Sequence, residues 1–149
     1  MTDTVANPLA LENQVCFALA VASRSVIALY RPVLEPLGLT HPQYLVMLAL
    51  WEHDPRSVGE LGTALQLEPA TLSPLLKRLE AAGYVTRTRS AGDERRLDIV
   101  LTASGRALRS KALAVPAAVA ERLAVPLETL EHTRDLLTGL IAAATRAPA

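Results

Sequence analysis

The sequence predicts a mainly α-helical domain with a small β-wing, arranged as a winged helix-turn-helix, and three observations support this fold class. Ser57 and the glutamate three residues later open a short apolar stripe, which is typical of a capped helix. From Pro69 to Gly83, apolar residues recur at helical spacing. The segment from Tyr84 to Leu101 alternates like two strands, with AGDER as the turn between them. Two short helices followed by a charged wing are typical of proteins that bind duplex DNA.

The N-terminal segment is predicted to form one long helix. Asn7-Pro8 resembles an N-cap followed by proline at the first helical position, so the helix is expected from there to about Tyr30. Pro32 and Pro36 then interrupt the chain. The apolar residues of this helix fall on one face: Val15, Leu19, Ala22, Val26 and Tyr30.

A second helix is predicted just before the DNA-binding unit. Thr40 is placed to cap it, and it begins near His41 and ends at Asp54-Pro55. Apolar residues leave it little polar face, so we expect it to lie centrally in the core.

Two further helices are predicted after the wing. Thr102 caps a long helix whose apolar stripe continues to Leu123, and Pro116 inside that stripe is expected to kink it. Val125-Pro126 breaks the chain again. A last helix follows and ends near Arg146.

The 149 residues amount to a single winged-helix domain, 1–149. Within it, we expect residues 40–101 to form the DNA-binding unit, with the wing at 84–101. The segments 8–37 and 103–146 carry more apolar surface than one small core needs, which predicts that they join two copies of the chain in a homodimer. A compact helical monomer is the alternative.

The charge distribution favours a local basic surface over a generally basic protein. The chain has 15 basic and 15 acidic residues, so its net charge is zero. The window 77–96 holds six basic and three acidic residues, which gives it a net charge of +3. A patch of this kind is sufficient for contact with phosphates.

Several classes of protein find no support in the sequence. No basic residue precedes Arg24, which argues against a signal peptide, and no uncharged run is long enough for a membrane span. One cysteine cannot form an intrachain disulfide and fits the cytoplasm. The three histidines show no metal-ligand spacing, and no phosphate-binding glycine loop or nucleophile motif occurs. We therefore expect no enzyme activity, no metal and no cofactor.

Four motifs resemble those of the MarR family of transcriptional regulators. These are LENQVCF, LTHPQYLVMLALWEH, TLSPLLKRLEAAG and RSAGDERRLDIVLT, within Leu11 to Thr102. More narrowly, the chain resembles the organic-hydroperoxide-responsive repressors called OhrR. The resemblance implies a cytoplasmic, homodimeric winged-helix repressor that binds a pseudo-palindromic operator in double-stranded DNA.

The helix that begins near Pro69 is expected to enter the major groove. Its exposed N-terminal residues are predicted to contact base edges or phosphates: Ala70, Thr71, Ser73 and Pro74. Pro74 has the alternative role of a helix-start residue only. Lys77 and Arg78 lie one turn further on and suit phosphates.

The wing supplies the remaining candidates for DNA contact. The resemblance implies that Arg95 enters the minor groove and that Asp93 orients it, and a narrow A·T-rich groove attracts such an arginine. Arg87 and Arg89 alternate on one strand face, where they either flank phosphates or are simply solvated.

Cys16 is the candidate switch. A lone cysteine on an apolar helix face is usually inert packing, and a helix that starts at Pro8 would place Cys16 too deep for the helix N-terminus to stabilise a thiolate. The resemblance implies instead a redox-sensing cysteine that organic hydroperoxides oxidise, with Tyr30 as a hydrogen-bonding phenol. Ala20 and His41 stand where the family has two further tyrosines, and His41 is able to donate in their place.

The spacing of Cys16 and Tyr30 and the identity of the inducer bear on how the switch works. Cys16 and Tyr30 are about 21 Å apart along one helix, so their contact requires a partner subunit. The alternative inducer is a small aromatic or phenolic ligand that releases the repressor without cysteine chemistry, in which case Cys16 lines an apolar pocket.

Overall fold

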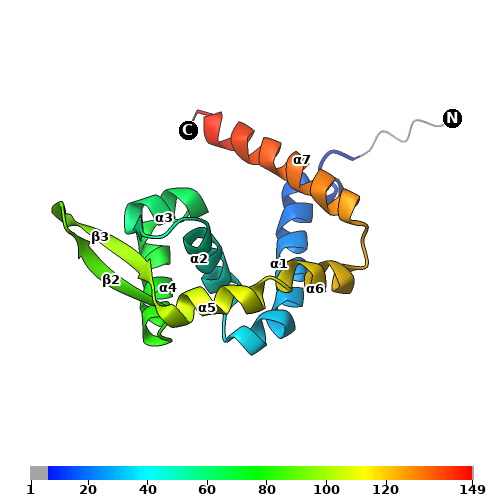
Figure 1. Ribbon diagram of the computed structural model, residues 1–149. Coiled ribbons are helices and arrows are strands. Elements are labelled where there is room, and N and C mark those ends of the chain that lie inside the picture. The colour runs from blue at the N-terminus through cyan, green and yellow to red at the C-terminus, as the bar shows by residue number, and fades with distance from the viewer. Residues whose placement is uncertain (1–6, 149) are drawn as a thin grey trace.

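The computed structural model describes residues 7–148, so the first six residues and the last residue of the predicted domain 1–149 lie outside the described residues. The α-helices are α1 (Val15–Leu34), α2 (His41–Glu52), α3 (Val58–Leu65), α4 (Pro69–Ala81), α5 (Ala103–Ala112), α6 (Val115–Leu123) and α7 (Leu127–Arg146). The 3-10 helices are η1 (Leu11–Asn13) and η2 (Glu35–Leu37). The strands are β1 (Arg56–Ser57), β2 (Val85–Ser90) and β3 (Asp93–Leu101). The prediction of a mainly helical winged fold is confirmed (Figure 1).

Most of the core of the protomer lies in the unit formed by α2, α3, α4 and the sheet, and the same core continues into α5, α6 and the end of α1. The strands pair antiparallel in the order β1-β3-β2. The large side chains of this unit with essentially no exposed surface are Val46, Met47, Leu50, Leu61, Leu72, Leu79, Val85 and Ile99. The central position predicted for the second helix is confirmed, since α2 contributes six buried residues.

Local capping explains where the helices of this unit begin. Thr40 and Gln43 form a reciprocal capping box at the start of α2. The Oγ of Ser57 accepts a hydrogen bond from the backbone N–H of Glu60 at 3.0 Å, so Ser57 caps α3 as predicted. The Glu60 carboxylate does not complete the box, because it turns outward to Arg96.

The N-terminal helix begins later than predicted. Asn7 caps only a turn: its Oδ1 accepts from the N–H of Leu9 at 3.0 Å, and η1 follows. Gln14 is extended, with φ −89° and ψ 119°, and its side chain donates back to the carbonyls of Pro8 and Ala10. The helix therefore starts at Val15, and a start at Pro8 is wrong. It also runs through Pro32 to Leu34.

The helix predicted from Thr102 to Leu123 is two helices. The expected kink at Pro116 is wrong, because α5 ends at Ala112 and α6 begins at Val115. Proline lacks the amide hydrogen and its ring clashes with the carbonyl four residues earlier, whereas the first turn of a helix tolerates it. The chain breaks just before Pro116, which then occupies the first turn of α6.

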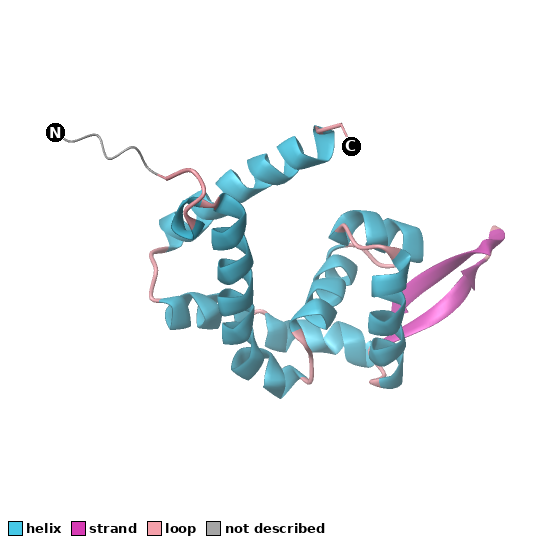
Figure 2. Ribbon diagram, turned by 180° about the vertical axis from the view of Figure 1, so that it is seen from behind, coloured by secondary structure: helices cyan, strands magenta, loops and turns pink. Residues whose placement is uncertain are grey.

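The terminal helices bury little within the protomer. Figures 1 and 2 show α1 and α6 beyond α5, away from the wing, with α7 extending from the end of α6. No residue of α7 is buried, and α1 buries only Leu34. Within residues 7–148, one helical stretch, Val15–Leu37, is long and apolar enough to cross a membrane by length and composition alone. Apolar residues left exposed on these segments include Val15, Phe17, Ile27, Leu136, Leu140 and Ile141.

Candidate nucleic-acid interface and redox site

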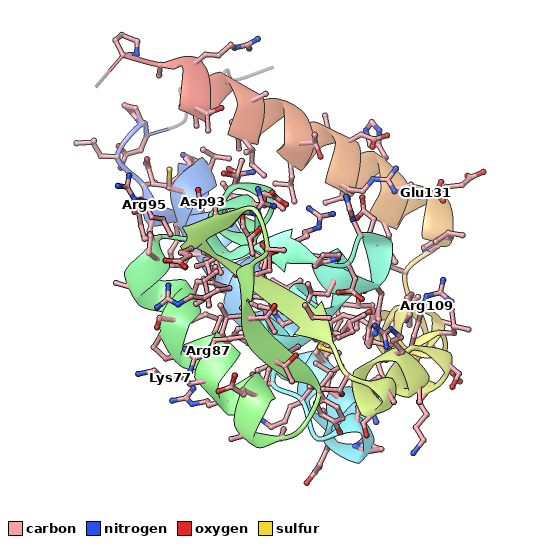
Figure 3. All side chains as sticks on the ribbon, turned by 60° about the vertical axis from the view of Figure 1, so that its left-hand side comes forward. Lys77, Arg87, Asp93, Arg95, Arg109 and Glu131 are labelled. Carbon is pink, nitrogen blue, oxygen red and sulfur yellow. The ribbon has the colours of Figure 1, made fainter. Side chains whose placement is uncertain are left out.

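The outer face of α4 carries the predicted recognition residues. Leu72, Leu75, Leu76 and Leu79 are buried against the core, which fixes the opposite face toward solvent. The exposed residues on that face are the ones that the sequence predicts: Ala70, Thr71, Ser73, Pro74, Lys77 and Arg78. Figure 3 shows Lys77 extending outward from α4.

Pro74 lies in the second turn of α4, since Pro69 occupies the first helical position. Its alternative role as a helix-start residue therefore belongs to Pro69. Because proline has no N–H, the carbonyl of Ala70 receives no helical hydrogen bond from residue 74. Helix α4 nevertheless continues to Ala81. Pro74 thus presents an apolar ring on the exposed face, with Ser73 beside it.

The wing is a hairpin with an irregular tip. Arg89 pairs with Leu97 and Ser90 pairs with Asp93, so the residues Glu94–Arg96 have no partner in β2 and bulge outward. The Oδ1 of Asp93 accepts from the backbone N–H of Arg95 at 2.9 Å. Figure 3 shows Asp93 and Arg95 together at the wing tip. Asp93 therefore shapes the backbone from which Arg95 projects, and the Arg95 guanidinium pairs with no carboxylate among residues 7–148.

The two arginines of β2 have partners within the chain. The guanidinium of Arg87 binds the carboxylate of Glu80 at 3.2 and 3.1 Å, and this hydrogen-bonded charge lowers the pKa of Glu80. Arg89 donates to the carbonyl oxygen of Glu94 at 2.7 Å. These contacts secure the wing to α4 and to its own tip, and phosphate contact by either arginine stays a prediction.

Arg96 forms a further link that is absent from the residues predicted by sequence. Its Nε donates to Oδ1 of Asp98 at 2.9 Å, and its Nη2 pairs with Oε1 of Glu60 on α3. The hydrogen bond to Asp98 and the charge of Glu60 raise the pKa of Arg96. The contact between Arg96 and Asp98 could be predicted from the sequence, because residues two apart on a strand lie on the same face. The contact with Glu60 could not, because Glu60 is distant in the sequence.

Cys16 is exposed and lies in the first turn of α1, as its second residue. The expectation that it lies too deep for help from the helix N-terminus is wrong, because the helix starts at Val15 instead of Pro8. The first amides of a helix lack intrahelical partners, and the helix dipole favours negative charge there.

Tyr30 and His41 come together at the opposite end of α1. Their ring centroids are 4.7 Å apart in an edge-on arrangement, and Tyr44 lies 6.0 Å from Tyr30. Burial lowers the pKa of His41, which favours the neutral imidazole over the cation. Tyr44 is 4% exposed and belongs to the core. Cys16 is about 21 Å away along α1, too far for contact with Tyr30 of the same protomer.

The fold and these surfaces define a winged-helix DNA-binding protein. The chain belongs to the MarR family, whose model matches residues 39–97. It is 46% identical over 109 residues to the organic hydroperoxide resistance transcriptional regulator of Bacillus subtilis strain 168. The aligned residues cover 73% of this chain and 74% of the relative. This membership confirms the predicted resemblance, and the chain is a DNA-binding transcriptional regulator and not an enzyme.

Two solved relatives share the fold over most of their length. Reduced AbfR of Staphylococcus epidermidis bound to DNA is 34% identical, with a TM-score of 0.74 over 91% of this chain and 95% of the relative. The same protein is known in an overoxidised form on DNA and in a disulfide form. CouR from Rhodococcus jostii RHA1 bound to p-coumaroyl-CoA is 26% identical, with a TM-score of 0.74 over 89% of this chain and 94% of the relative.

Proposed function

We propose that this chain is a homodimeric repressor that leaves its operator when an organic hydroperoxide oxidises Cys16. The observation that carries the proposal is the exposed Cys16 at the N-terminal turn of α1. The similarity to an organic hydroperoxide resistance regulator and to AbfR, which is known reduced on DNA and in a disulfide form, supports it.

DNA binding uses the exposed face of α4 and the wing. Thr71 and Ser73 offer hydroxyls to base edges or phosphates in the major groove, and Lys77 and Arg78 contact phosphates one turn on. Arg95 projects from the wing bulge into the adjacent minor groove. Two such units related by a twofold axis bind a pseudo-palindromic operator in double-stranded DNA.

The segments 8–37 and 103–146 form the dimer. The absence of buried residues in α7 and the exposed apolar residues of α1 leave surfaces that a second copy would cover. Burial between subunits also accounts for the apolar character of Val15–Leu37 in a cytoplasmic DNA-binding protein.

Oxidation begins with attack of the Cys16 thiolate on the peroxide. The sulfur takes the terminal hydroxyl oxygen of ROOH, the O–O bond breaks, and the alkoxide leaves and is protonated to ROH, which produces the sulfenic acid. A small thiol then displaces water from the sulfenic acid to form a mixed disulfide. In the proposed dimer, the phenol nearest to the sulfur of Cys16 is Tyr30 of the partner subunit, and His41 of the partner subunit lies beside that phenol. Oxidation of the sulfur therefore alters contacts between the two subunits.

The alternative function is a repressor released by a small aromatic or phenolic ligand. A cavity of about 630 Å³ between α1 and the start of α2 favours it, and its lining includes the apolar Ile27 and the basic Arg24 and Arg31. The complex of CouR with p-coumaroyl-CoA is consistent with a ligand of this class in the family.

A DNA-release assay separates the two functions. A duplex is first selected from a randomised pool by the wild-type protein, and its release is measured with cumene hydroperoxide and with cumyl alcohol, which has nearly the same shape but cannot oxidise. Oxidative switching predicts release by the hydroperoxide alone, loss of release in Cys16→Ser, and a matching mass increase on Cys16. Release by both compounds, unchanged in Cys16→Ser, would establish the ligand-responsive alternative.

A further inference from the structure

Three charged side chains meet where the wing faces α3. Arg96 binds Oδ1 of Asp98 on its own strand at 2.9 Å and also pairs with Glu60 of α3. The backbone N–H of Glu60 is itself held by the Oγ of Ser57, which caps α3. Arg96 therefore connects the wing directly to the helix that precedes the recognition helix.

This connection lies at one end of the bulge that carries Arg95. Beyond it, β3 is fixed to β1, where Ser57 pairs with Asp98. At the other end of the bulge, Asp93 holds the backbone of Arg95. Arg95 thus projects from a segment of three residues, Glu94–Arg96, that is unpaired with β2 and anchored on both sides.

We propose that Arg96 is a positioning residue, which acts through Glu60 and Asp98 to hold the wing bulge so that Arg95 enters the minor groove. The inference deepens the DNA-binding part of the function proposed above and rests on it. Ion pairs as exposed as these, with the Arg96 side chain 45% and the Glu60 side chain 43% accessible, contribute little to the stability of the fold. Their effect is therefore on the direction of Arg95 and not on the stability of the domain.

Direct contact between Arg96 and a phosphate makes the opposite prediction for Glu60. If Arg96 binds DNA itself, Glu60→Gln removes a competing negative charge and strengthens binding. If Arg96 holds the wing, the same change weakens binding although it makes the protein more positive. The sign of the Glu60→Gln effect thus separates the two roles.

The experiment measures the affinity of Glu60→Gln and Arg96→Ala for the selected duplex and for the same duplex with its A·T-rich flanks changed to G·C. Both variants are expected to bind the selected duplex about 3- to 10-fold more weakly, with an unchanged melting temperature. Both should also lose the preference for A·T flanks, as Arg95→Ala does, since that preference depends on the inserted arginine. The double variant should bind no more weakly than Arg96→Ala.

Glu94→Gln is the matched control, since Glu94 lies on the same bulge and its carboxylate bonds to no other residue among those described. It should keep or slightly raise the affinity and keep the flank preference. Tighter binding by Glu60→Gln, or equal weakening on both duplexes, would overturn the positioning role.

Hydrogen exchange at the wing amides of the free protein tests the link between Arg96 and Glu60 without DNA. Exchange is expected to be faster in Glu60→Gln than in Glu94→Gln. Failure of the wild type to select any duplex would refute DNA binding instead, and equal exchange rates would refute the link.

Discussion

Gly105 lies where the start of α5 meets the strand that leads into the wing. A Cβ added at this position would lie 2.1 Å from the carbonyl oxygen of Tyr84, which is backbone and cannot move aside cheaply. The carbonyl of Gly105 also accepts a hydrogen bond from Nε1 of Trp51 at 2.9 Å. Close packing of the Gly105 backbone against the backbone of Tyr84 thus depends on the missing side chain.

We predict that Gly105→Ala destabilises the protein by about 1–3 kcal/mol, although alanine is the better helix former. Gly59→Ala is the control, because its Cβ would meet only Oγ of Ser57 at 3.9 Å. That variant should be neutral or more stable by up to about 1 kcal/mol. Urea unfolding of both variants checks the pair, and a Gly105→Ala protein as stable as wild type would contradict the packing described.

His41 predicts a pH dependence of stability. Its folded-state pKa is lowered by burial, so the unfolded chain binds this proton at a higher pH than the folded chain does. Stability is therefore lost as the pH falls below the unfolded pKa of about 6.5, and the loss ends once the pH passes below the folded pKa. The group contributes no such loss above the unfolded value.

The measurement is the urea midpoint of wild type and His41→Gln from about pH 7.5 to about pH 5.5, where His41 titrates and carboxylates largely do not. The wild type should lose stability toward the acid end of this range, and His41→Gln should lose less. Parallel curves for the two proteins would show that burial of His41 is not the cause.

At the scale of elements, α7 is a helix without a core of its own. Leu140 and Ile141 are 43% and 48% exposed in the protomer. We predict that Leu140→Glu combined with Ile141→Glu weakens the dimer by at least about 10-fold, because it places charge in an apolar interface. Sedimentation equilibrium measures the change.

Ala142→Glu is the control on the same helix. It lies on the arc that already carries Glu128, Glu131 and Asp135, so its added charge should remain in solvent. Dissociation by Ala142→Glu to the same degree would mean that the polar face of α7, and not its apolar face, joins the subunits.

The elements also show what a single sequence can predict. Leucine spacing in α4, the Ser57 cap and the strand alternation around AGDER indicate structure through local physics, and the protein has each of these elements. The start of α1 could not be found in this way, because Asn-Pro begins a turn as readily as a helix. The outcome at Gln14 depends on its side chain folding back onto two carbonyls.

In the candidate site, too, some features could be predicted from local sequence patterns and others could not. The exposed face of α4 follows from its own periodicity, and so does the placement of Asp93 and Arg95 at a turn. The partners of Arg87 and Arg96 depend on how the wing sits against α3 and α4, which no local pattern encodes. The meeting of Tyr30 and His41 likewise requires the turn between α1 and α2 to be known.

At the scale of the whole molecule, a protein of zero net charge must bind DNA through a local surface. We predict that its affinity falls steeply with salt. Lys77→Ala combined with Arg78→Ala removes four candidate phosphate contacts from a dimer, so the slope of log K against log salt should become shallower by about 3 to 4. Binding should weaken on all duplexes alike, because phosphates carry no sequence.

Titration of wild type and variant at several potassium chloride concentrations gives both slopes. Lys111→Ala, on α5 away from the recognition face, should leave the slope unchanged. An unaltered slope in the Lys77→Ala/Arg78→Ala protein would move the phosphate-binding surface elsewhere.

The lack of buried residues in α7 has a consequence for the amount of protein in the cell. A helix in a protein draws most of its stability from the packing of its apolar face, so α7, which buries no residue within the protomer, depends on a second chain to cover it. The concentration of the chain therefore has a threshold, which is the dissociation constant of the dimer. Below it, monomers with loose C-terminal segments predominate, and no pair of recognition helices is held at operator spacing. Binding to the operator should therefore rise with the concentration of the chain as dimers form.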